Sequence, residues 1–155
     1  MSEPAPSDKP DAYRKALGLL VRREHSRREL KRKLNAKGVD PVDAAAALET
    51  LNRQGYQDDT RFSEMLVRTR IGGGYGPLRI RAELGTHGIA VEVVATVLAE
   101  ADPDWTALAI EALRRRHGSQ PARDRAEMHK RGHFLQRRGF DIECIRAATS
   151  GKLEY

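Results

Sequence analysis

The hexapeptide Leu34–Val39 (LNAKGV) has two counterparts in this chain, Leu84–Ile89 (LGTHGI) and Leu135–Phe140 (LQRRGF). In each, a glycine follows a leucine by four positions, and the three glycines lie 50 and then 51 residues apart. A helix end bearing a basic side chain or histidine, then glycine, then an apolar residue, is typical of a left-handed C-cap with its hydrophobic contact. The recurrence predicts an internal repeat with one helix-to-helix corner in each unit.

The apolar side chains on either side of these corners follow a helical period. Leu30 and Leu34 share a face before the first corner, and Ala44 and Leu48 share a face after it. No stretch alternates as a half-buried strand does, and the valine-rich segment Val91–Val97 keeps helical spacing. We therefore predict an all-α fold.

Start signals divide each unit into three helices. Ser26 followed by Glu29 is a capping box, and Asp40 before Pro41 places an N-cap ahead of a proline at the first helical position. The helices are predicted to be about 11–14 residues long, and such small units are expected to stack into an elongated, curved array. The predicted organisation is a disordered leader at 1–10, helical repeats at 11–55, 56–102 and 103–149, and a tail at 150–155.

Composition limits the partners and the compartment. The 155 residues include 28 Lys and Arg against 22 Asp and Glu, and the formal net charge of +6 favours anionic partners. Cys144 is the only thiol, which excludes an intramolecular disulfide and a thiolate zinc site. No apolar run approaches the roughly 20 residues of a membrane span, and no long heptad seam predicts a coiled-coil dimer. We expect a cytoplasmic monomer without membrane contact.

Basic side chains gather towards both ends. Residues 1–52 carry 11 basic and 8 acidic side chains, residues 53–103 carry 6 and 7, and residues 104–155 carry 11 and 7. Such clusters are either solvated helix faces or contacts with phosphates and acidic side chains, and the presence of two favours contacts. The candidate contacts are Arg22, Arg23, Arg27, Arg28, Lys31, Arg32, Lys33, Arg114, Arg115, Arg116, Lys130, Arg131, Arg137 and Arg138.

Other motifs have structural interpretations. The glycine-rich segment Gly72–Pro77 has no following Lys-Ser or Lys-Thr pair, which favours a flexible connector over a phosphate-binding loop. His129 and His133 lie four residues apart but lack an evident third metal ligand. Asp58 and Asp59 directly precede a predicted helix and are interpreted as its caps. We therefore predict no catalytic residue, no metal and no cofactor, and hence no enzyme.

Several segments form a recognisable set. Leu51–Phe62 reads LNRQGYQDDTRF, and Gly76–Pro77 is followed by Ile80–Ile89 (IRAELGTHGI) and then by Phe134–Phe140 (FLQRRGF). Together these motifs resemble the RecX family, bacterial regulators of the RecA recombinase, over residues 12 to 149. The chain departs from the pattern in its richer glycine run and in Arg131, which stands where an apolar side chain is expected.

The resemblance implies a regulator without chemistry of its own. It implies tandem three-helix repeats that bind the RecA nucleoprotein filament, in its helical groove, and restrain ATP hydrolysis, strand exchange and co-protease activity in recombination, DNA repair and the SOS response. We expect the basic ends to contact recombinase subunits, with some side chains reaching DNA phosphates, single- or double-stranded. The alternative is a direct DNA-binding helical module, in which the corner Leu34–Leu48 mimics a helix-turn-helix.

Overall fold

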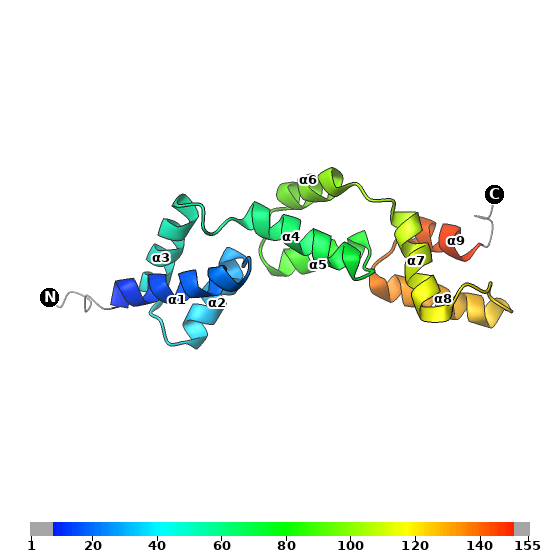
Figure 1. The fold of residues 1–155 in the computed structure, drawn as a ribbon, viewed down its shortest axis with the longest axis horizontal. Coiled ribbons are helices and arrows are strands. Elements are labelled where there is room, and N and C mark those ends of the chain that lie inside the picture. The colour runs from blue at the N-terminus through cyan, green and yellow to red at the C-terminus, as the bar shows by residue number, and fades with distance from the viewer. Residues whose placement is uncertain (1–7, 151–155) are drawn as a thin grey trace. The chain divides into compact units, whose positions relative to one another are not determined.

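The computed structural model describes residues 8–150, and the regular structure in this part of the chain is entirely α-helical (Figure 1). The helices follow one another in three sets of three, as the spacing of the glycine corners predicts. They are α1 (Asp8–Arg22), α2 (Arg27–Ala36), α3 (Pro41–Arg53), α4 (Asp59–Gly72), α5 (Pro77–Thr86), α6 (Val91–Ala101), α7 (Trp105–His117), α8 (Arg125–Arg138) and α9 (Ile142–Thr149). The predicted all-α class is confirmed.

The first helix begins earlier than predicted. α1 starts at Asp8, so the last three residues of the predicted leader are helical, while residues 1–7 lie outside the described part of the chain. Pro10 does not prevent this, because backbone N–H groups in the first turn have no acceptor within the helix. Helix lengths from 8 to 15 residues also span a wider range than expected.

The predicted glycine corners are confirmed. Gly38, Gly88 and Gly139 have φ angles of 82°, 71° and 95°, in the left-handed region that glycine adopts without strain. After the first and third corners, the N–H of Val39 donates to Leu34 and that of Phe140 donates to Leu135, at 3.0 and 3.1 Å. These bonds satisfy carbonyls at the helix end and turn the chain into the next helix.

The caps predicted for α2 and α3 are confirmed, and the prediction for α4 is corrected in one residue. Ser26 Oγ accepts from the N–H of Glu29 at 3.1 Å, and Asp40 accepts from Val42 at 2.8 Å ahead of Pro41. At α4, only Asp58 caps the helix, accepting from Thr60 and Arg61 at 2.8 and 3.1 Å. Asp59 instead accepts from the backbone N–H of Arg27 at 2.9 Å, so it caps α2, a helix 32 residues away in sequence.

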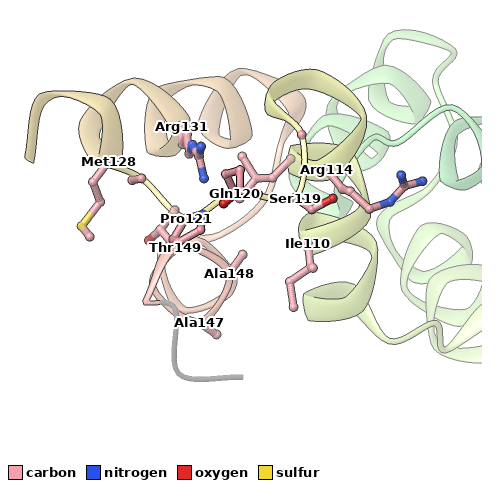
Figure 2. A pocket seen from close by; sticks show the side chains of 13 residues that line it. Ile110, Arg114, Ser119, Gln120, Pro121, Met128, Arg131, Ala147, Ala148 and Thr149 are labelled. Carbon is pink, nitrogen blue, oxygen red and sulfur yellow. The ribbon is translucent and has the colours of Figure 1, made fainter. Parts of the chain in front are cut away.

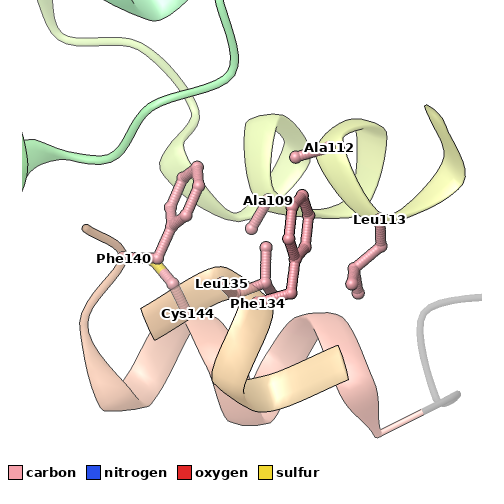
Figure 3. Close-up of a cluster of buried hydrophobic side chains, with 7 residues drawn as sticks. All are labelled: Ala109, Ala112, Leu113, Phe134, Leu135, Phe140 and Cys144. Carbon is pink, nitrogen blue, oxygen red and sulfur yellow. The ribbon is translucent and has the colours of Figure 1, made fainter. Parts of the chain in front are cut away.

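The described chain divides into two compact units. One comprises residues 8–65 with His87–Ile89, and the other comprises Leu66–Thr86 with residues 90–150. The core of the first contains Ala16, Leu30, Leu34, Ala44, Leu48 and Leu51. A core cluster of the second contains Ala109, Ala112, Leu113, Phe134, Leu135, Phe140 and Cys144, drawn from α7, α8, the corner that follows α8 and the start of α9 (Figure 3). Each core uses the apolar positions that flank a glycine corner.

The glycine-rich connector is packed, which corrects its prediction as a merely flexible segment. The N–H of Gly76 donates to Arg138 at 2.8 Å, and that of Leu78 donates to Gly139 at 3.0 Å. A Cβ on Gly76 would lie 2.5 Å from the Gly139 carbonyl, so only glycine permits this approach. Pro77 is the first residue of α5, a position that proline favours. The connector therefore holds the start of α5 against the end of α8.

Candidate functional site

Part of the first basic cluster stabilises the fold internally. Arg23 pairs with the buried carboxylate of Glu29 at 2.5 Å, and Lys33 lies 3.6 Å from the same carboxylate. Burial disfavours the charged form of Glu29, but the hydrogen bond and charge of Arg23 outweigh it and lower the pKa of Glu29. Lys33 also lies 2.9 Å from Nε2 of His25, whose pKa burial lowers. Arg23 and Lys33 are thus committed to intramolecular contacts.

Arg27 and Arg28 also have partners within the first unit. The guanidinium of Arg27 pairs with Glu49 at 3.2 Å. The guanidinium of Arg28 lies against the second glycine corner, where a Cβ on Gly88 would stand 2.9 Å from its Cζ. These contacts leave both side chains at the surface but hold them in place.

Three cations of this cluster point outward without such contacts. Arg22, Lys31 and Arg32 are exposed, and no carboxylate within residues 8–150 pairs with them. We call these three side chains the α1–α2 cations. Since they carry three full charges that nothing in the described fold neutralises, they are the part of the first cluster that is available to an anionic partner.

The second basic cluster is divided in the same way. Arg114 and Arg115 pair with Glu111 at 2.6 and 3.1 Å, and the hydrogen bond from Arg114 is the main reason that the pKa of Glu111 falls to about 2. Lys130 is exposed. Arg131 is only 8% exposed and pairs with Glu127 at 2.8 Å. The structure therefore removes Arg131 from the candidate surface contacts, because its aliphatic stem fills the apolar position and its charge is paired internally.

Two more arginines of this cluster, Arg116 and Arg138, lie beside aromatic rings together with Arg79. The guanidinium carbons of Arg79 and Arg138 lie 4.5 and 4.6 Å from the centroid of the Tyr75 ring. Those of Arg138 and Arg116 lie 5.2 and 5.9 Å from the centroid of Phe134. The six residues Tyr75, Arg79, Arg116, Phe134, Arg137 and Arg138 line a cavity of about 330 Å³, which we call the arginine hollow.

Three members of the arginine hollow, Tyr75, Arg79 and Phe134, are not among the contacts predicted from the sequence. Arg79 and Tyr75 stand in a segment of near-neutral charge, where no basic cluster marks them. The signal that could have found them is the spacing of Tyr75 and Arg79 across Gly76 and Pro77, which places a ring and a cation one helical turn apart at the start of a helix. Tyr75 and Arg79 lie close to Arg138 because the connector packs against the end of α8. No pattern of neighbouring residues in the sequence predicts this packing.

A second cavity lies within the third repeat (Figure 2). It measures about 330 Å³ and is lined mainly by apolar side chains, among them Ile110, Met128 and Ala148. Arg131 also lines it, and Nε of that guanidinium has no hydrogen-bond partner within residues 8–150. The lining is suited to packing apolar groups rather than to acid–base chemistry.

Neither a metal cluster nor a membrane-spanning helix occurs in the part of the chain that the structure describes. No group of three His, Cys, Asp or Glu side chains there has a geometry that could hold a metal ion. No helix there is long and apolar enough to cross a membrane.

Comparison with known families accounts for the three-helix sets. Residues 12–51, 58–98 and 102–149 match the first, second and third three-helix domains of RecX. The chain belongs to the RecX family. A relative named regulatory protein RecX from Xanthomonas axonopodis pv. citri (strain 306) is 54% identical over 140 residues, covering 90% of this chain and 86% of the relative. Another, from Xanthomonas campestris pv. campestris (strain B100), is 48% identical over 161 residues and covers 99% of both chains.

Solved RecX structures share the fold. A crystal structure of regulatory protein RecX superposes with a TM-score of 0.77 at 24% identity, covering 92% of this chain and 72% of the other. RecX from Lactobacillus salivarius superposes with a TM-score of 0.75 at 21% identity, covering 93% and 96%. These similarities confirm the resemblance to RecX and the fold of three-helix repeats. The names of the relatives assign this chain to a family of regulatory proteins.

Proposed function

We propose that this chain binds the RecA nucleoprotein filament and lowers its ATPase, strand-exchange and co-protease activities. It acts in the cytoplasm in recombination, DNA repair and the SOS response, as a monomer and without catalysis of its own. The observation that carries the proposal is the match of all three RecX domains along one chain, with relatives named regulatory proteins. The outward cations of both units supply the attraction, since a filament wound on DNA presents many negative charges.

The mechanism that these surfaces support is restraint of the filament. The α1–α2 cations and the arginine hollow each contact the filament, and a contact made to more than one subunit opposes the movements that accompany nucleotide turnover. Such contacts lower ATP hydrolysis without any group of the regulator approaching the nucleotide. Blocking of filament growth at its end is the competing mechanism, and it would leave hydrolysis by preformed filaments unchanged.

The test is ATP hydrolysis by RecA on single-stranded DNA, measured against increasing amounts of this protein. We expect inhibition at less than one chain per recombinase subunit. A variant carrying Arg22→Gln, Lys31→Gln and Arg32→Gln should require at least tenfold more protein, since it loses about three charge contacts. Its control carries Arg14→Gln, Arg53→Gln and Arg68→Gln, which removes three exposed charges elsewhere and should inhibit as the parent does.

One result would overturn the proposed function, and a second would overturn only the role of the α1–α2 cations. The first is the absence of inhibition by the parent protein together with tight, salt-sensitive binding to DNA alone, which would favour the direct DNA-binding module. The second is an equal loss of inhibition in both triple variants, which would show that net charge, rather than the α1–α2 cations, determines binding.

A further inference from the structure

The arginine hollow concentrates positive charge in one small concavity. Arg79 comes from α5, Arg116 from α7, and Arg137 and Arg138 from α8. The guanidinium carbons of Arg79 and Arg138 lie 4.5 and 4.6 Å from the centroid of one ring, that of Tyr75, so both charges lie beside that ring. Bringing like charges together costs free energy that an anion bound among them recovers.

The four arginines differ from their neighbours in having no acidic partner. In the same unit, Arg70 pairs with Glu83 at 2.6 Å, and Arg114 pairs with Glu111 at 2.6 Å. Within residues 8–150, no carboxylate forms an ion pair with Arg79, Arg116, Arg137 or Arg138. Four guanidiniums without an acidic partner in this part of the chain therefore form a surface that attracts anions.

The side chains are also held in position before any ligand arrives. Arg138 donates from Nη1 to the carbonyl of Gly73 at 3.0 Å, and Arg79 donates from Nη1 to the carbonyl of Arg137 at 3.3 Å. These bonds use one N–H group of each side chain, while a guanidinium has five. The cation–π contacts with Tyr75 restrain both guanidiniums further. The loss of side-chain freedom on binding is correspondingly small.

We propose that the arginine hollow binds phosphodiester groups of a single-stranded nucleic acid. A tetrahedral phosphate accepts from guanidiniums that approach from several directions, as those on α5, α7 and α8 do, whereas a planar carboxylate is matched best by one coplanar fork. A flexible single strand can turn successive phosphates into a concavity, while a duplex presents its phosphates on a stiff, convex rod. The inference deepens the proposed function, since it gives the regulator a direct contact with the strand inside the filament.

The experiment measures binding of a fluorescent oligothymidylate to the full chain by anisotropy at several salt concentrations, without recombinase. Arg79→Gln and Arg116→Gln should each weaken binding by about fivefold or more and reduce the salt slope by about 0.7, the value for one phosphate contact on a single strand. Arg81→Gln is the matched control, because Arg81 is exposed on the same helix two residues from Arg79 and so faces away from the hollow. It should bind as the parent does.

A third variant separates geometry from charge. Arg138→Lys keeps the positive charge but loses the planar guanidinium that lies beside Tyr75 and Phe134, so its affinity for the oligothymidylate should fall while the net charge stays constant. Circular dichroism verifies that each variant is folded. Because Arg79 and Arg116 are exposed, their substitution tests the hollow even where the variant at Arg138 loses stability.

The outcomes separate this inference from the proposed function. Parental affinity in Arg79→Gln and Arg116→Gln overturns the hollow as a nucleic-acid site, whatever RecA hydrolysis shows. Equal competition by polyglutamate and by unlabelled oligothymidylate also overturns it, in favour of an acidic peptide, and tighter binding of duplex overturns the single-strand assignment. Loss of affinity in these variants, from a parent that fails to inhibit RecA, supports the hollow and rejects only the proposed function.

Discussion

Replacing Gly76 by alanine should destabilise the second unit far more than the small size of the change suggests. The added Cβ would lie 2.5 Å from the carbonyl carbon and oxygen of Gly139 and 2.6 Å from the nitrogen of Phe140. The backbones must separate, which breaks the bonds from Gly76 to Arg138 and from Leu78 to Gly139, at 2.8 and 3.0 Å. At about 1 kcal/mol for each bond, with overpacking beside buried Phe140, the expected loss is about 2–4 kcal/mol.

A second glycine, Gly85 in α5, provides a control variant whose stability should change in the opposite direction. A Cβ on Gly85 meets nothing within 4 Å, and the residue does not have a positive φ. Gly85→Ala should therefore raise stability by about 0.5–1 kcal/mol through helix propensity alone. The two variants have the same composition, so any difference between them arises from position.

Urea unfolding monitored by the fluorescence of Trp105 is the assay. Trp105 is the only tryptophan, and it packs against the core cluster of the second unit, so its signal reports that unit. The midpoint of Gly76→Ala should fall and that of Gly85→Ala should rise, at equal slopes. A midpoint of Gly76→Ala within error of the parent would refute the close approach of the connector to the end of α8.

Three further predictions concern titration, capping and thiol reactivity. Burial lowers the pKa of His25 below 6.5 in the folded protein, so the stability that neutral His25 contributes is complete above pH 6.5 and is lost as the pH falls through the folded-state pKa. Urea unfolding at a series of pH values should show this loss of stability in the parent and a smaller loss in His25→Gln. Asp59→Ala removes acceptors for Arg27 and Gln57 and should cost about 1–2 kcal/mol in thermal unfolding, whereas an unchanged midpoint would contradict the cap. Burial raises the pKa of Cys144, so an aromatic disulfide reagent should react slowly until the protein is denatured; rapid reaction of the folded protein would contradict its burial.

The corners and most helix starts could be predicted from the sequence because they depend on neighbouring residues. Gly38 requires only its own φ, and Ser26 reaches Glu29 within one turn. Asp59 shows the limit of such reasoning. Its position before a helix predicts that it caps that helix. In the structure its carboxylate accepts from the backbone N–H of Arg27, 32 residues away, and only the folded unit brings these two groups together.

The candidate site was less predictable than the fold. The sequence identifies which side chains are charged but not which charges are already paired, so Arg22 and Arg23 are equivalent until Glu29 is placed beside one of them. Arg131 is misassigned because a charged residue is expected outside, although its stem packs inside and Glu127 neutralises it. The sequence does not predict a role for Arg79, because this residue joins the arginine hollow only through the packing of the connector against α8.

The start of α2 has a consequence for any attempt to add, remove or exchange repeats. Its hydroxyl at Ser26 lies 2.7 Å from Nδ1 of His87, and its first N–H is capped by Asp59, both from residues of the second helical set. His87 in turn lies 4.6 Å from Phe62, ring centroid to ring centroid. A chain shortened to its first three helices would leave these groups without partners, so the first set depends on the second for part of its stability. The repeats are therefore not interchangeable, because residues of the second repeat complete the hydrogen bonds at the start of α2 in the first.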